Sequence, residues 1–189
     1  MKKLAVFVAA ALSLTGVAEA QQRAGILIVD TDRILNECTA CKAASAQLQS
    51  QVQQGRTRAQ QLEASLKPEA EGLEKAIQAL GGKQPDAALQ ARITAFRNKQ
   101  QQGSTELSNR ESSIQSTQAH VQQQIGSKIV QVVEQSRVRR QATVVLSKGN
   151  TLASDNSIDI TGEVLAALNQ QLPAVSVTPL PQQARPQGR

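Results

Sequence analysis

The chain has 189 residues, a formal net charge of +6 and 1% aromatic residues, with no Trp and no Tyr. This length fits one domain with a large extension. Binding sites for nucleic-acid bases commonly stack them on aromatic rings, and sugar sites often do the same, so the composition nearly excludes both. Any core must be built from Leu, Ile, Val and Ala.

Residues 1–20 contain the three parts of a secretory signal peptide. Lys2 and Lys3 form the charged start, residues 4–14 form the apolar core, and Ala18-Glu19-Ala20 is an A-x-A cleavage site. The apolar core is too short to span a bilayer. We therefore expect cleavage after Ala20 and export to a bacterial periplasm.

A small α/β body is predicted from two separate stretches, residues 21–38 and 142–172. Residues 25–29 are typical of a buried strand, and Asp30 can cap a short helix after it. Residues 142–147 and 151–154 predict two more strands, joined by a tight turn at residues 148–150. Thr161 then begins a helix that Pro173 ends, and the Pro-rich residues 173–189 predict a disordered tail.

Residues 39–141 predict two long helices that turn back on each other at a tip near residues 81–86. Apolar or small residues recur in steps of three and four along both helices, which indicates a heptad seam. In the returning helix the middle of this seam is polar or empty, at Gln100, Gly103 and Arg110. Forty residues in a helix give an arm of about 60 Å. Pro68 either kinks the first helix or ends it at Lys67.

The fold class that follows is α+β, with a long antiparallel helical hairpin rooted in a small β body. Three short strands make a poor sheet by themselves, because their edges stay exposed. Assembly with other copies of the chain would cover those edges and supply a core.

Four stretches of this chain match one known pattern: residues 26–37, residues 42–48, residues 143–146 and the run Ser157-Ile-Asp-Ile-Thr-Gly-Glu-Val-Leu-Ala-Ala-Leu-Asn169. In this order they resemble the Skp/OmpH family of periplasmic chaperones. The resemblance implies a homotrimer, in which strands from three copies form one body and three hairpins surround a cavity. It also implies a protein that is not an enzyme, needs no cofactor or ATP, and holds unfolded outer-membrane proteins in that cavity.

Two sets of residues are the candidate interaction sites. Trimerisation of the body is expected to use Ile26, Ile28, Val144 and Leu146. Client proteins are expected to bind apolar residues in the distal half of the hairpin, namely Leu66, Leu73, Ile77, Leu80, Leu89, Ile93 and Phe96. Most of this second set also lies on the seam, so these residues fit equally well a role in holding the hairpin together. Ile77 lies off the heptad.

The charge pattern bears on two further partners. Some family members carry basic arm tips, which implies contact with an anionic membrane surface. Here residues 63–86 contain three Lys against five acidic residues, a balance of −2. The positive charge lies nearer the body, at Arg56, Arg58, Arg137, Arg139 and Arg140. Such a cluster is also compatible with nucleic acid, but export argues against that partner, and we expect none.

Cys38-Thr-Ala-Cys41 is the one stretch with obviously reactive side chains. A C-x-x-C at a helix N-terminus can serve a thiol–disulfide oxidoreductase, but the βαβ frame of such proteins is missing. A local disulfide is the simpler interpretation in an oxidising compartment, and an inter-chain link or a metal are alternatives.

The single histidine, His120, has no second ligand nearby, so we expect no metal site and a solvent-facing side chain. The main alternative function is a structural coiled-coil scaffold of the cell envelope without clients.

Overall fold

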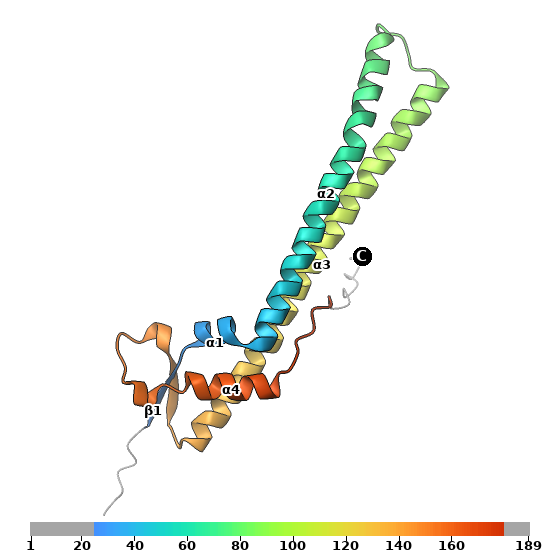
Figure 1. The fold of residues 1–189 in the computed structure, drawn as a ribbon. Coiled ribbons are helices and arrows are strands. Elements are labelled where there is room, and N and C mark those ends of the chain that lie inside the picture. The colour runs from blue at the N-terminus through green and yellow to red at the C-terminus, as the bar shows by residue number, and fades with distance from the viewer. Residues whose placement is uncertain (1–24, 180–189) are drawn as a thin grey trace, which may run out of the picture.

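A computed structural model describes residues 25–179 as a long helical hairpin with a small body at one end (Figure 1). The hairpin consists of α2 (Thr39–Ala79) and α3 (Ala87–Arg139). The other elements are β1 (Ile26–Val29), α1 (Thr31–Glu37), β2 (Val144–Ser147), the short 3₁₀ turns η1 (Lys148–Asn150) and η2 (Asn156–Ile158), and α4 (Thr161–Gln171). The predicted fold class, a helical hairpin with a small β part, is confirmed.

Both long helices begin at a side chain that satisfies a free backbone N–H group. At the start of α2 the Cys38 sulfur accepts a hydrogen bond from the Cys41 N–H at 3.0 Å. At the start of α3 the Asp86 carboxylate accepts one from the Leu89 N–H at 2.8 Å. Such caps fix where a helix begins, because the first turn has no intrahelical partners for its donors.

The chain reverses at two glycines and leaves α3 through a left-handed residue. Gly81 and Gly82 have φ angles of 55° and 89°, a region that glycine adopts without a steric penalty. At the other end of α3, Gln141 has a φ of 53°, and the Ala142 N–H donates to the Arg137 carbonyl at 3.0 Å. This is the hydrogen bond of a Schellman-type helix end, and it turns the chain into β2.

Pro68 lies inside α2, which continues without interruption to Ala79. The alternative of a helix end at Lys67 is therefore wrong. Pro68 itself is exposed, whereas Leu66 and Leu73 on the same helix are covered to a greater degree. The ring thus faces away from the seam with α3, and the missing N–H group costs one hydrogen bond without disturbing the packing of the hairpin.

The sheet has two strands in the described part of the chain, not the three that were predicted. β1 and β2 are parallel, in a register that pairs Ile26 with Val144. The predicted strand at residues 151–154 is wrong, because this segment is irregular and its one large apolar side chain, Leu152, is fully exposed. The edge of β1 is occupied instead by the segment before α4, where the Ile160 N–H donates to the Ile28 carbonyl at 2.9 Å.

The core lies where the body meets the base of the hairpin. It combines one face of the sheet with α1, α4 and the neighbouring turns of α2 and α3. Its buried apolar residues are Leu27, Val29, Ile34, Cys38, Ala40, Cys41, Ala44, Val121, Ile125, Ile129, Val132, Ala142, Ile160, Val164 and Leu168.

The described part of the chain continues after α4 through residues 172–179. Disorder was predicted from residue 173, but residues 173–179 run from α4 along the base of the hairpin (Figure 1), and Val175 and Val177 pack against the core. The predicted signal peptide at residues 1–20 and residues 180–189 lie outside the described residues. Within residues 25–179, every helix is too short or too polar to cross a bilayer.

Candidate interaction surfaces

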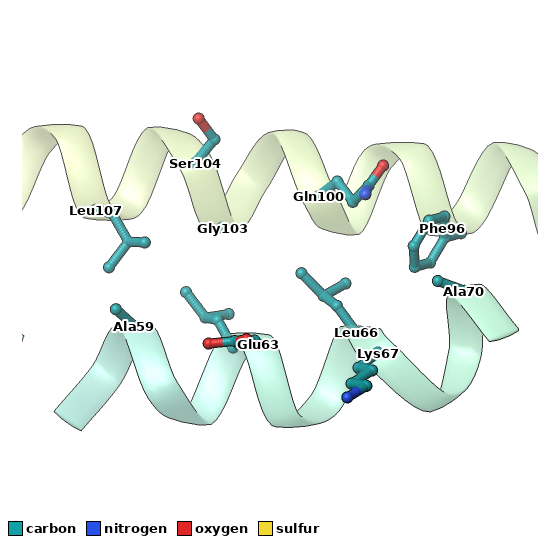
Figure 2. A pocket seen from close by; sticks show the side chains of 11 residues that line it. Ala59, Glu63, Leu66, Lys67, Ala70, Phe96, Gln100, Gly103, Ser104 and Leu107 are labelled. Carbon is teal, nitrogen blue, oxygen red and sulfur yellow. The ribbon is translucent and has the colours of Figure 1, made fainter. Parts of the chain in front are cut away.

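The seam between α2 and α3 is open in its distal half. A cleft of about 630 Å³ lies there. Figure 2 shows Leu66, Phe96 and Leu107 pointing into it from the two helices. Ser104 points away from it. The residues that line the cleft are Ala59, Leu62, Glu63, Leu66, Lys67, Ala70, Phe96, Gln100, Gly103, Ser104 and Leu107. The cleft is therefore apolar at its centre and carries charged residues in its lining.

A second cleft of about 480 Å³ continues the first toward the tip. It shares Ala70, Phe96 and Gln100 with its neighbour and adds Leu73, Ile77 and Ile93. A third cleft of about 470 Å³ lies toward the body and is lined by Val52, Gly55, Arg56, Ala59, Leu107, Arg110, Glu111, Ile114 and Gln115. The hairpin thus presents a row of shallow apolar clefts, where a closed two-helix coiled coil would present a sealed seam.

The seven predicted client-binding residues fall into two groups. Leu73 and Leu89 are only 5% and 9% exposed. They pack between the two helices and leave little surface for a ligand to contact. Leu66, Leu80, Ile93 and Phe96 are half-buried, and Ile77 is 47% exposed. The structure brings five of the seven, Leu66, Leu73, Ile77, Ile93 and Phe96, to the two distal clefts. Leu80 and Leu89 line neither.

Four residues that shape these clefts are absent from the predicted set. Ala59, Leu62 and Leu107 line the first cleft, and Gly103 supplies no side chain in its middle. A Cβ atom at Gly103 would lie 3.4 Å from a methyl carbon of Leu62, an ordinary contact. The signal was present in the sequence, because a seam that reads Gln100 and then Gly103 leaves a space where two large residues would normally meet.

Ion pairs join the two helices beside the clefts. Arg58 on α2 binds Glu106 on α3 through two hydrogen bonds of 2.7 and 2.8 Å, and Lys99 binds Glu69 at 2.8 Å. The hydrogen bond from Arg58 lowers the pKa of Glu106. These pairs are partly exposed, so they set the register of the hairpin more than they add stability.

One face of the sheet is apolar and uncovered except at Ile28. Side chains alternate along a strand, and Leu27, Val29 and Val145 point toward the core. On the opposite face Ile26, Val144 and Leu146 are 46%, 37% and 44% exposed, whereas Ile28 is buried. Within the described residues β2 pairs only with β1, so its second edge is open. Three of the four predicted trimer residues therefore share an exposed face next to a free strand edge.

Cys38 and Cys41 are joined by a disulfide with an S–S distance of 2.06 Å. Both belong to the buried core, between α1 and α2. A redox-active pair exposes its attacking sulfur, so this position favours a structural role.

His120 differs from the prediction of a solvent-facing side chain. It is half-buried, and its Nδ1 atom is covered without a hydrogen-bond partner in the described part of the chain. It lies one turn before Gln124, where residues 173–179 cross α3. No cluster of three or more His, Cys, Asp or Glu side chains able to hold a metal ion occurs among residues 25–179.

Three of the basic residues near the body are engaged with carboxylates. Arg137 binds Glu134 at 2.7 Å, and Arg139 and Arg140 bind Glu163 at 2.7 and 2.8 Å. Burial alone would raise the pKa of Glu163, but hydrogen bonds from Arg140 and Arg139 outweigh it and lower that pKa. The arginine cluster thus fastens the end of α3 to α4, and much of its charge is neutralised locally.

Comparison with known proteins identifies the family. Residues 25–168, more than half of the chain, match the family described as outer membrane protein (OmpH-like). A crystal structure of a candidate outer membrane chaperone (OmpH-like) from Caulobacter crescentus CB15 has the same fold. The TM-score is 0.69, with 84% of this chain and 93% of that chain covered, at 20% sequence identity. No curated protein matches the chain. The chain therefore belongs to the OmpH-like family.

Proposed function

We propose that this protein is an ATP-independent periplasmic holdase that keeps unfolded outer-membrane proteins between the arms of a homotrimer. The observation that carries the proposal is the row of apolar clefts along the seam of the hairpin, two of which lie in its distal half. A helical hairpin that served only as a spacer would gain stability by closing its seam. This hairpin leaves Ile77 exposed and Phe96 half-covered.

The clefts suit an unfolded chain better than a defined small ligand. They are shallow and repeat along the arm, and large polar side chains such as Gln100 interrupt them. Burial of apolar surface is non-directional, so such clefts can accept many sequences with weak contacts. Many weak contacts on one client add up, because each bound segment raises the effective concentration of the next.

The exposed face of the sheet supports assembly. Ile26, Val144 and Leu146 form an apolar patch beside the open edge of β2. An open strand edge next to an apolar face is a surface that proteins normally cover, and a second copy of the same edge is the simplest cover. Together with the family membership, this supports the homotrimer. The predicted signal peptide supports the periplasmic location.

Holding activity can be tested by light scattering. A denatured outer-membrane β-barrel protein is diluted into buffer without ATP, with and without the mature chain. We expect the chain to suppress scattering at about one trimer per client. Undiminished scattering, from protein shown to be folded and oligomeric, would contradict the proposal and favour the scaffold alternative.

A double variant tests whether the clefts carry the activity. Ile77→Ser with Phe96→Ser removes the most exposed and the largest of the predicted client-binding side chains, and we expect holding to weaken without loss of oligomer. The matched control is Ala79→Ser with Ala95→Ser, which lie on the exposed sides of the same helices and line none of the described clefts. Equal holding by both variants would contradict the assignment.

Assembly has its own test. Leu146→Glu places a charge on the exposed apolar face of β2, and we expect the mass in light scattering after size exclusion to fall from three copies to one. Leu152→Glu is the control, because Leu152 is exposed but lies outside the sheet. A trimer that survives Leu146→Glu would place the interface elsewhere.

A further inference from the structure

The segment after α4 is held in an extended conformation at the base of the hairpin. Pro173 ends the helical part of the chain, and residues 174–179 then follow the hairpin away from the body (Figure 1). Two glutamines fix it there. The Gln124 side-chain amide donates to the Ser176 carbonyl at 3.0 Å and accepts from the Ser176 N–H at 3.1 Å. Gln51 donates to the Val177 carbonyl at 3.1 Å.

These contacts recognise backbone, not side-chain identity. A glutamine amide that pairs with both backbone groups of one residue does what a neighbouring strand does in a sheet. The side chains that do take part follow an alternating pattern. Val175 and Val177 pack against the core, whereas Ser176 and Thr178 are exposed, with their hydroxyl oxygens 2.8 Å apart.

This pattern is the one that strands of a membrane-spanning β-barrel carry, with apolar and polar residues in strict alternation. Extended-peptide recognition elsewhere combines the same two features, main-chain hydrogen bonds for affinity and pockets for every second side chain. The contacts that residues 174–178 make therefore require only an extended backbone with apolar residues at positions i and i+2. We call the site formed around Gln124 and Gln51, which these residues occupy, the Gln124–Gln51 seat.

We infer that the Gln124–Gln51 seat is a binding site for an extended, alternating segment of a client, and that residues 174–178 are its internal occupant. This inference rests on the proposed holdase function and extends it from the distal clefts to the base of the hairpin. The internal segment is attached to α4 and is thus present at high effective concentration. A client segment must compete with it, so the apparent affinity of the site for that client segment is lower.

The segment is held by few contacts, as a displaceable occupant should be. Three hydrogen bonds and two partly buried valines fasten it, and Ser176 is exposed. Val121, Ile125, Ile129 and Val132 of α3 also pack in the core with α1 and α4, so the segment is only one of the elements that cover the base.

The test compares the full chain with a chain that ends at Leu172. The probe is the synthetic peptide Ala-Val-Ser-Val-Thr with a Trp added at its end, and a second probe alternates Ile and Thr before the same Trp. Because the chain contains no Trp or Tyr, tryptophan anisotropy reports the peptide alone. We expect both peptides to bind the truncated chain at least tenfold more tightly than the full chain.

Two controls make the result specific. In the truncated chain Gln124→Ala should weaken binding of both peptides, whereas Gln123→Ala, at an exposed neighbouring position, should not. A peptide with the same residues but adjacent valines should bind at least fivefold more weakly. Equal affinity for the full and truncated chains, or binding of the tail sequence but not of the Ile/Thr peptide, would overturn the inference.

A full-length variant covers the case in which truncation unfolds the body. Val175→Asp with Val177→Asp should release the segment and raise peptide affinity in the same way, with helix content checked by circular dichroism. The light-scattering assay separates the two proposals. If the full chain suppresses aggregation but no variant gains peptide affinity, this inference is wrong and the holdase function stands. If peptides bind but no form of the chain suppresses aggregation, the holdase function is wrong and the seat has no client role.

Discussion

The two halves of the hairpin follow the same spacing of three and four residues yet pack differently. At the base, Val121, Ile125, Ile129 and Val132 of α3 are all buried. In the distal half, Leu73 and Leu89 are buried while the other large apolar side chains of the seam stay half-covered. The base has a third layer over the helix pair, formed by α1, α4 and residues 173–179. Among residues 25–179, the distal half has no such layer.

Two helices by themselves can cover only one narrow stripe of each other. A wider apolar stripe needs a third element, or it stays open. At the base the stripe is wide and is covered, so it acts as core. Farther out the seam contains Gln100, Gly103 and Arg110, and the stripe opens into clefts. The buried core and the open apolar surface are thus at opposite ends of the same pair of helices.

The largest difference between the halves should appear when one leucine is truncated in each. Leu168 on α4 is fully buried against the base, and Leu168→Ala should lower the free energy of unfolding by about 2–5 kcal/mol. Leu66→Ala in the distal cleft should cost about 1 kcal/mol or less, because water already reaches the site. Chemical denaturation followed by circular dichroism measures both. Equal losses would mean that the distal seam is as closed as the base.

The body should also respond to acid through one ion pair. The Lys148 ammonium, 2.7 Å from the carboxylate, and hydrogen bonds from Thr161 lower the pKa of Asp159 to about 2. Because the folded pKa lies below that of the unfolded chain, the stabilisation is complete above about pH 4 and is lost as the pH falls toward 2. Asp159→Asn should therefore cost on the order of 1–2 kcal/mol at pH 7, allowing for the exposure of Lys148.

The pH profile separates this charge effect from simple loss of packing. Thermal unfolding of the two proteins should differ at pH 7 and converge near pH 2. Glu71→Gln, which changes an exposed carboxylate far from this ion pair, is the comparison variant. A constant gap between Asp159→Asn and the natural chain from pH 7 to pH 2 would rule out the ion pair as the cause.

Gly103 offers a way to close the distal seam by one methyl group. Alanine is favoured over glycine in a helix by about 0.8–1.0 kcal/mol, and the new Cβ would meet Leu62 at an ordinary contact distance. Gly103→Ala should therefore stabilise the hairpin slightly and reduce holding activity in the scattering assay. Gly126→Ala is the matched control, because it gains the same propensity at a site with nothing within 4 Å. Reduced holding by both variants would point to helix stiffness and away from the cleft.

Local patterns predicted the hairpin because each part of it is specified by nearby residues. The seam follows from spacing and the tip from Gly81 and Gly82, whereas the sequence left Pro85 and Asp86 as alternative starts for α3, and the structure selects Asp86. The open middle was visible in Gln100 and Gly103. Its consequence, clefts lined by Leu62 and Leu107, required knowing how closely the two helices approach.

The features that the sequence did not reveal depend on partners far away in the chain. Residues 151–154 resemble a strand but are irregular, and the segment that pairs with the other edge of β1 is the one before α4. Val175 and Val177 look like isolated apolar residues in a Pro-rich tail. They become ordered because Gln124 and Gln51, more than fifty positions earlier, supply backbone partners. No local propensity encodes either pairing.

The smallest expected effect concerns the ion pair that spans the clefts. Arg58 and Glu106 are joined by two hydrogen bonds across α2 and α3, but both side chains are partly exposed. The solvent screens such a pair, and added salt screens it further. Glu106→Gln should therefore leave the melting temperature close to that of Glu71→Gln, an exposed carboxylate on the same hairpin, with any difference vanishing at high salt. A clear loss of stability that persists at high salt would show that this pair, and not the apolar seam, holds the distal helices together.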